Sequence, residues 1–164
     1  MMLELHHITI GQQIYHLSLM VNDGELLTIS GSQGSGKTTL LRAILGFLPV
    51  DEGHISIDGE LLTPQSAPYF RRQMAYVPQQ LSLPDGCRLE GFERWTQMTS
   101  DERYLFILMR ALQSGKSLIL VDEPAVALAT ETAMQVDGLL REAAGRGMTI
   151  VAVNERIMDN QVKL

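Results

Sequence analysis

The sequence lacks several features that whole classes of protein require. Cys87 is its only cysteine, which excludes an internal disulfide and is typical of a reducing compartment. No apolar run is long enough to span a bilayer, and the start, MMLELHHITI, has neither the basic region nor the cleavage site of a signal peptide. We therefore expect a cytoplasmic chain. If a membrane is involved, another chain must provide the membrane-spanning part.

Positive charge is also scarce. The 13 Lys and Arg residues are outnumbered by 19 Asp and Glu residues, which gives a formal net charge of −6. Because a nucleic-acid backbone is usually bound by a basic surface, this balance argues against nucleic acid as the main partner. The four histidines have no partners at ligand spacing along a helix or strand, which argues against a zinc site. The length of 164 residues predicts one domain over 1–164.

Strand-like and helix-like segments alternate along most of the chain. Apolar patterns predict strands at Leu3–Ile10, Ile14–Val21, Leu26–Ser30, His54–Gly59, Met74–Val77, Ser117–Val121 and Thr149–Val153. Helices are predicted from about Lys37 to Phe47, from a capping box at Thr99 and Glu102 to Gly115, and from about Leu128 to Ala144. This order predicts an α/β fold with a parallel sheet, helices on both faces, and antiparallel strands near the N-terminus.

A glycine-rich stretch, ISGSQGSGKTTL, joins a predicted strand to a predicted helix. Gly31, Gly36, Lys37 and Thr38 fit the pattern G-x-x-x-x-G-K-[ST], in which the backbone folds tightly around an anion. The start of the helix adds partial positive charge. Lys37 is expected to reach the β- and γ-phosphates, and the Thr38 hydroxyl to coordinate Mg²⁺. The residues expected to bind the nucleotide are Gly31, Ser32, Gln33, Gly34, Ser35, Gly36, Lys37, Thr38 and Thr39.

Two acidic residues follow the apolar run SLILV. Asp122 stands at the carboxyl end of a predicted buried strand, where open α/β sheets bind their ligands, so it is placed to hold the water shell of a metal. Glu123 comes next, and a carboxylate there could accept a proton from an attacking water. Asp122 could alternatively be no more than the opening of a turn before Pro124.

Several longer stretches resemble the ATPase domain of the ABC family. The segment Gly24–Gly59 is similar to the first half of such a domain, and MAYVPQQ to the segment carrying the Q-loop glutamine, here Gln79. ERYLFILMRALQSGKSLILVDEP resembles the stretch that joins the signature helix to the second acidic motif. The resemblance implies a P-loop NTPase fold, ATP and Mg²⁺ as ligands, a dimer with nucleotide between the subunits, and usually a membrane permease partner.

The resemblance also assigns roles to single residues. Lys37, Gln79 and Glu123 are implied as catalytic, with Glu123 as the general base. Thr38, Gln79 and Asp122 are implied as the metal-binding residues. For the aromatic side chain that stacks on adenine in the family, the N-terminal strands offer only Tyr15, although a tyrosine at strand spacing is more often a packed or half-exposed residue.

The chain departs from the family pattern at four places. The signature segment aligns with MTSDE, Met98 to Glu102, in which Asp101 would place negative charge where an anion should sit. The D-loop aspartate aligns with Ala129 and the switch histidine with Glu155, whose carboxylate would repel a γ-phosphate. The segment between Gln79 and Met98 is short, which predicts a truncated helical subdomain.

These features lead to one principal function and two alternatives. The principal prediction is the ATP-binding subunit of a membrane transporter, which binds Mg-ATP and hydrolyses it slowly. It would form a homo- or heterodimer with another ATP-binding subunit and work with a separate permease at the inner face of the membrane. The first alternative is a regulatory module that binds ATP with little or no hydrolysis. The second is a small P-loop kinase.

Overall fold

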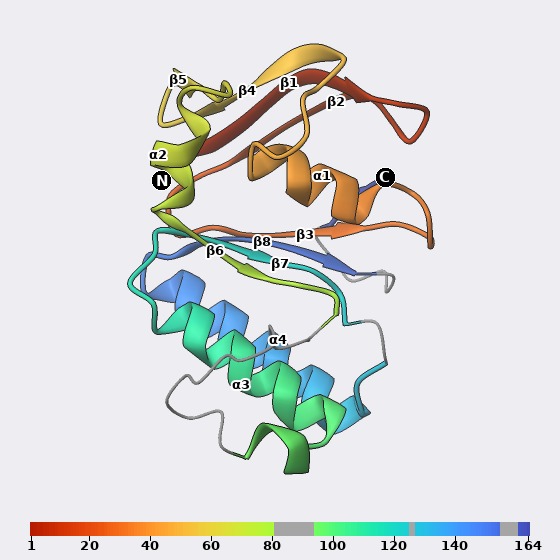
Figure 1. Cartoon of the computed structure of the whole chain (residues 1–164), viewed down its shortest axis with the longest axis vertical. Helices are drawn as coiled ribbons and strands as arrows, with labels where there is room; N and C mark the ends of the chain where they lie inside the picture. The colour runs from red at the N-terminus through yellow and green to blue at the C-terminus, as the bar shows by residue number, and fades with distance from the viewer. Residues whose placement is uncertain (81–93, 125–126, 155–160) are drawn as a thin grey trace.

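The computed structural model describes residues 1–80, 94–124, 127–154 and 161–164, and it contains two sheets (Figure 1). The parallel sheet has the order β6-β7-β8-β3-β9 and the antiparallel sheet the order β2-β1-β4-β5. The parallel strands are β3 (Leu26–Ser30), β6 (Met74–Val77), β7 (Leu118–Val121), β8 (Thr149–Asn154) and β9 (Gln161–Lys163). The antiparallel strands are β1 (Leu3–Ile10), β2 (Ile14–Val21), β4 (Glu52–Ile57) and β5 (Glu60–Leu61). The predicted α/β fold is confirmed.

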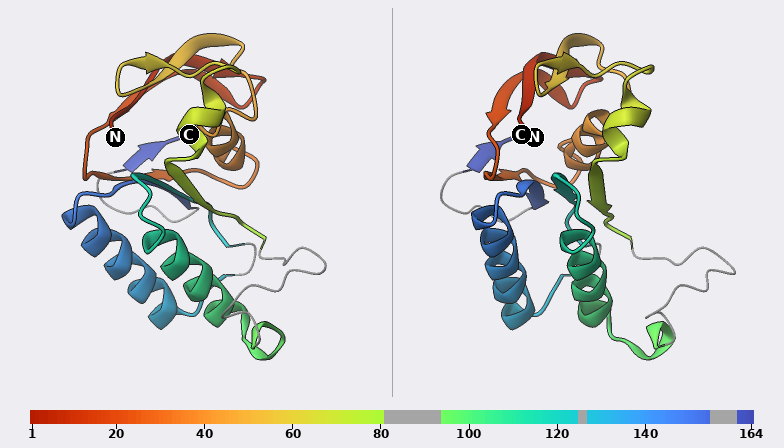
Figure 2. Two further views of the ribbon diagram at one scale, coloured as in Figure 1. Left: turned by 60° about the vertical axis from the view of Figure 1, so that its left-hand side comes forward. Right: turned by 90° about the vertical axis from the view of Figure 1, so that its left-hand side faces the viewer.

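The helices form separate layers on the two faces of the parallel sheet. Helix α1 (Lys37–Ile44) lies between the two sheets, while α3 (Ser100–Leu112) and α4 (Thr130–Gly145) run side by side across the opposite face (Figures 1 and 2). A short helix, α2 (Ala67–Arg71), leads into β6, and a 3₁₀ turn, η1 (Trp95–Gln97), precedes α3. In the described part of the chain, no helix is long and apolar enough to cross a membrane.

Strand β7 shows why both faces of the sheet are apolar. Leu118 and Leu120 pack into the core that contains α1, and Ile119 and Val121 pack into the core beneath α3 and α4. Successive strand residues point to opposite faces, so a continuous apolar run serves both cores. The residue after Val121 therefore lies on the α1 face of the sheet.

The structure differs from the sequence predictions at several segments, including the following three. Helix α1 ends at Ile44 and not near Phe47, since Gly46 adopts a φ of 70° that a helix does not accommodate. Strand β4 runs from Glu52 to Ile57 and stops before Asp58 and Gly59, which both have positive φ. Strand β9 was not predicted, because three residues at a sheet edge carry no periodic pattern.

Candidate functional site

A cavity of about 230 Å³ opens at the carboxyl edge of the parallel sheet. The glycine-rich loop of residues 31–36, which the sequence predicts to bind phosphate and which we call the phosphate loop, follows β3. Gln79 follows β6 and Asp122 follows β7, so one edge gathers segments from across the sequence. The residues that line the cavity have polar side chains or are glycines: Gln13, Gln33, Gly34, Gly36, Lys37, Thr38, Thr39, Gln79, Asp122 and Glu123. Of the predicted nucleotide-binding residues, Gly31, Ser32 and Ser35 belong to the loop without lining this cavity.

Two glycines of the loop occupy positions that a side chain could not. A Cβ atom on Gly31 would lie 2.3 Å from Ser35 Oγ, and one on Gly36 would lie 3.0 Å from the Cβ of Gln13. Gly36 also has a φ of 97°, in the left-handed region that favours glycine. The close turn of the loop therefore depends on both residues.

Helix α1 begins with its backbone donors directed toward this loop. Gly36 is the N-cap residue, no side chain of the described residues caps the helix, and no acidic residue stands in the first turn. The first N–H groups of a helix need an acceptor from elsewhere and carry partial positive charge. Within the loop, Ser35 Oγ is buried and has no hydrogen-bond partner among the described residues. This arrangement is suited to bind an anion.

Lys37 supplies the full positive charge of the site. Its Nζ donates hydrogen bonds to the carbonyl oxygens of Gly31 at 2.6 Å and Ser32 at 2.9 Å. The ammonium group is thereby held against the loop, on the side where the cavity opens. A positive charge fixed here favours a ligand that carries several negative charges.

Asp122 and Thr38 meet at the floor of the cavity. Thr38 Oγ1 donates to Asp122 Oδ2 at 2.8 Å, and Asp122 is 1% exposed. The backbone N–H of Glu123 donates to the other carboxylate oxygen, Oδ1, at 3.0 Å. Hydroxyl and carboxylate oxygens are the ligands that Mg²⁺ prefers, so this pair fits that ion.

Two tyrosines that the sequence analysis did not single out hold Asp122 in place. Tyr76 OH donates to Asp122 Oδ2 at 3.0 Å, and Tyr104 OH donates to the Asp122 carbonyl oxygen at 2.9 Å. Burial, followed by the negative charge of Asp122, raises the pKa of both phenols well above the usual value. Both groups therefore stay protonated as donors. Strand alternation places Tyr76 on the α1 face of β6, a signal that could have identified it.

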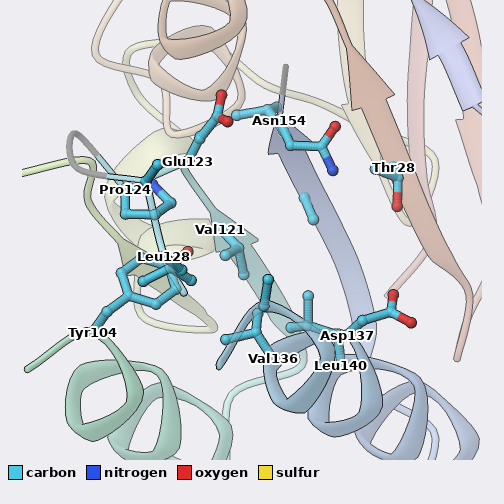
Figure 3. A pocket seen from close by; sticks show the side chains of 14 residues that line it. Thr28, Tyr104, Val121, Glu123, Pro124, Leu128, Val136, Asp137, Leu140 and Asn154 are labelled. Carbon is cyan, nitrogen blue, oxygen red and sulfur yellow. The ribbon is translucent and has the colours of Figure 1, made fainter. Parts of the chain in front are cut away.

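Gln79 and Glu123 complete the wall of the cavity. Glu123 also borders a second cavity of about 140 Å³ on the other face of the sheet, where apolar side chains predominate, among them Val136 and Leu140 of α4 (Figure 3). In that view its carboxylate turns away from Val136 and Leu140. Glu123 thus stands between the two cavities, with its charged end away from the apolar one.

Gln13 is a further residue of the site that the sequence analysis missed. Its Nε2 donates to the Gly34 carbonyl oxygen at 3.0 Å, and its Oε1 accepts from Thr39 Oγ1 at 3.1 Å. The side chain therefore ties the phosphate loop to the first turn of α1. No motif marks it, because the contact joins a turn in one sheet to a loop of the other.

The signature segment, Met98 to Glu102, contains the side chains that cap the start of α3. Thr99 and Glu102 form the predicted capping box of α3 in both directions. Asp101 was expected to stand where an anion should sit, but its Oδ2 accepts a hydrogen bond from the backbone N–H of Ala129 at 3.0 Å. It thereby anchors the residue that precedes α4. The switch position, Glu155, and most of the segment between Gln79 and Met98 lie outside the described residues.

The structure bears on two other points of the sequence analysis. Tyr15 does not line the cavity: it is 74% exposed, and its ring packs edge-on against His16 with centroids 5.7 Å apart. His54 does have a strand partner, since it pairs with His6 across β1 and β4 and the two rings stack with centroids 4.6 Å apart. A pairing between strands this far apart in sequence is not visible from local spacing.

Comparison with known proteins places this arrangement in a family. The family model for ABC transporters matches residues 14–103. A high-affinity branched-chain amino acid transport ATP-binding protein, BraG of Pseudomonas aeruginosa, is 27% identical over 88% of this chain and 76% of its own length. Some other curated relatives are far longer: the chain spans 13% of an ABC-type transporter, atr1 of Mycosarcoma maydis, to which it is 26% identical over 86% of its own length.

Solved structures show the same fold. An ATP-binding subunit of an ABC transporter superposes with a TM-score of 0.77 at 20% identity, covering 94% of this chain and 79% of that one. A dimeric ATP-binding cassette in a post-hydrolysis state, bound to ADP and Pi, gives a TM-score of 0.74 at 22% identity, covering 94% and 88%. With the family model matching more than half of its residues, the chain belongs to the ABC transporter family of ATP-hydrolysing, ATP-binding domains.

Proposed function

We propose that this chain is the ATP-binding subunit of a membrane transporter and binds Mg-ATP in the cavity above Thr38 and Asp122. The observation that carries the proposal is the 2.8 Å hydrogen bond between these two side chains, directly below an uncapped helix start. The bond brings the metal-binding oxygens to the place where the loop donors and Lys37 bind a triphosphate tail. Relatives whose names describe transport ATP-binding proteins support the transporter role.

Each residue of the site has a part in the proposed hydrolysis. Lys37 and the loop N–H groups neutralise the phosphate oxygens, and Thr38 and Asp122 hold Mg²⁺, which supplies further neutralisation of that charge. Gln79 positions the attacking water, and Glu123 accepts its proton. Tyr76 keeps the Asp122 carboxylate in position from below.

The partners that we propose follow from the family. A second ATP-binding subunit, identical or different, pairs with this one. A separate permease subunit provides the membrane-spanning part. The chain then lies on the cytoplasmic side, peripheral to the membrane. Its net charge of −6 gives no basis for a nucleic-acid partner.

Hydrolysis is proposed to be slow. The start of α3 is less suited to a partner's nucleotide, because the capping box already satisfies the N–H groups of Thr99 and Glu102 and two acidic residues stand in its first turn. We expect a turnover of roughly 1 s⁻¹ or less, against a typical enzyme value of about 10 s⁻¹. The same closed helix start supports the alternative function, a regulatory module that holds ATP without cleaving it.

A turnover measurement on a matched pair of variants tests the proposal. Glu123→Gln is expected to lower the steady-state rate at least about 100-fold, as expected for loss of a general base, with ATP affinity retained. Glu131→Gln, in the first turn of α4, is the control and should leave the rate unchanged. A rate equal in both variants contradicts the assignment of Glu123. ATP binding with no product in a single turnover of the unchanged protein favours the regulatory module.

A further inference from the structure

The peptide bond between Asp122 and Glu123 is held by hydrogen bonds on both of its sides. Its carbonyl oxygen, that of Asp122, accepts from Tyr104 OH at 2.9 Å. Its N–H, that of Glu123, donates to Asp122 Oδ1 at 3.0 Å. A peptide unit is planar, so bonds at two of its edges restrict both the ψ angle of Asp122 and the φ angle of Glu123. These two angles set the direction in which the Glu123 side chain leaves the end of β7.

The donor to the carbonyl oxygen is a deeply buried group. Tyr104 is 2% exposed and packs in the core beneath α3 and α4, together with Leu108 of the same helix. Burial, followed by the negative charges of Asp122 and Glu123, raises the pKa of the phenol, so it stays protonated. A hydroxyl held by such packing donates from a fixed point, which suits it to fix the direction of a carbonyl group.

The direction of Glu123 matters because this residue stands between two cavities. A general base must face the polar cavity, where Lys37 and Thr38 lie, whereas apolar side chains predominate in the other cavity. In Figure 3 the Glu123 carboxylate turns away from Val136 and Leu140 of α4. Rotation of the peptide bond before Glu123 would swing the carboxylate away from the phosphate side.

We propose that Tyr104 is a positioning residue for ATP hydrolysis, which directs Glu123 toward the attacking water by fixing the peptide bond that precedes it. The proposal deepens the proposed function and rests on its assignment of Glu123 as the general base. Tyr104 belongs to α3, which begins in the signature segment, so the same hydrogen bond ties the direction of the base to the position of that helix. Tyr76 has a different part, because it donates to the carboxylate of Asp122 and so supports the metal site.

Tyr104→Phe tests the proposal, because it removes the hydroxyl and keeps the ring in the core. Misplacement of a catalytic group by about 1 Å can cost roughly 100-fold in rate, and we expect kcat for ATP hydrolysis to fall about tenfold or more. KM for ATP and the apparent affinity for Mg²⁺ should stay within about twofold, since the phosphate loop and the Asp122 carboxylate keep their partners. Tyr69→Phe, exposed on α2, is the matched control and should leave kcat unchanged.

A double-mutant cycle with Glu123→Gln distinguishes positioning from a merely structural role. Residues that act as a unit are not additive, so Tyr104→Phe should cause no further loss in the single-turnover rate of Glu123→Gln. An equal loss of rate in both backgrounds would overturn the proposal, because Tyr104 would then act on another part of the site. Unfolding in urea checks that each variant is folded. Weaker binding of ATP and Mg²⁺ together with a lower kcat would also overturn it, by showing that Tyr104 supports the whole site.

The same measurements separate this proposal from the proposed function. If Glu123→Gln keeps the rate of the unchanged chain, the proposed hydrolysis fails, and the positioning role fails with it. The same holds if the unchanged chain forms no product in a single turnover. If Glu123→Gln loses the rate while Tyr104→Phe keeps it, only the positioning role of Tyr104 fails.

Discussion

Two helix starts in this chain, those of α1 and α3, are built in opposite ways. Helix α1 begins after a glycine in the left-handed region, with no side-chain cap among the described residues and no acid in its first turn. Helix α3 begins after Thr99, which caps it reciprocally with Glu102, and its first turn contains two acidic residues. The family likeness assigns a nucleotide contact to both segments. Of the two, the α1 start is the one that no side chain of the described residues caps and that has no acidic residue in its first turn, which suits an anion.

The comparison shows that a helix N-terminus becomes a binding site only when the chain leaves its donors open. Asp101 strengthens the contrast, because it accepts a hydrogen bond from Ala129 and thus serves the start of a third helix, α4. The α3 end therefore supports the fold, and the α1 end is available for chemistry. Four changes test this contrast between the helix starts of α1 and α3 and the account of the site that goes with it.

Of these four changes, Gly36→Ala, which adds a side chain to the phosphate loop, is expected to have the largest effect on ATP binding. A side chain at a φ of 97° is strained by about 1–2 kcal/mol, and its Cβ would meet Gln13 and Ile14 at 3.0 and 3.1 Å. We expect ATP affinity, measured by calorimetry, to fall at least tenfold. Gly138→Ala is the control, since nothing lies within 4 Å of that position in α4, and it should stabilise the helix by about 1 kcal/mol without changing affinity. Equal affinities in the two variants would contradict the role given to the loop.

A second effect concerns the carboxylate below the loop. Tyr76→Phe removes the phenol that donates to Asp122 Oδ2 at 3.0 Å, and outer partners of a metal ligand are typically worth about 10–100-fold in metal affinity. We expect the apparent affinity for Mg²⁺ at saturating ATP to fall about tenfold. Tyr69→Phe, on the exposed side of α2, should leave it unchanged. An Mg²⁺ titration of Tyr76→Phe that matches the unchanged chain would contradict a role for Tyr76 in metal binding.

Loss of the α3 cap should lower the stability of the protein without changing its affinity for ATP. Thr99→Ala removes the cap of α3 and should lower the free energy of unfolding by about 1 kcal/mol, measured with urea. ATP affinity should stay within about twofold, because none of the described residues that line the cavity comes from that helix start. Thr96→Ala, in the preceding 3₁₀ turn, should change neither quantity. A tenfold change in ATP affinity on loss of Thr99 would mean that the α3 end takes part in binding.

The smallest effect is expected at alkaline pH. The pKa values of Tyr76 and Tyr104 are raised in the folded protein, whereas unfolded tyrosines ionise near pH 10. The unfolded chain therefore loses protons first, so the two phenols contribute their stability below about pH 10 and lose it as the pH rises further. The double variant Tyr76→Phe, Tyr104→Phe should show a flatter decline in the free energy of unfolding above pH 10. Parallel declines would contradict this origin.

The sequence predicted the phosphate loop and the position of Asp122 because both follow from local rules. Gly36 and Lys37 stand at fixed spacing, and an apolar run such as Leu118–Val121 must end at the edge of a parallel sheet. Strand alternation could have identified Tyr76. Gln13 and Tyr104 could not be found from local rules, because the contact of Gln13 joins two sheets and that of Tyr104 joins a helix to a strand end. Asp101 shows the same limit: its residue type suggested repulsion of an anion, while its geometry gives it a backbone partner in another helix start.

The most direct test of the account is calorimetry with Mg-ATP on two lysine variants. Lys37 lies against the phosphate loop and donates hydrogen bonds to the carbonyl oxygens of Gly31 and Ser32. Lys116 lies in the loop before β7 and donates to the Arg72 carbonyl oxygen. The account predicts no measurable ATP binding by Lys37→Ala and unchanged binding by Lys116→Ala. Binding of ATP by Lys37→Ala with an affinity equal to that of the unchanged chain would contradict it.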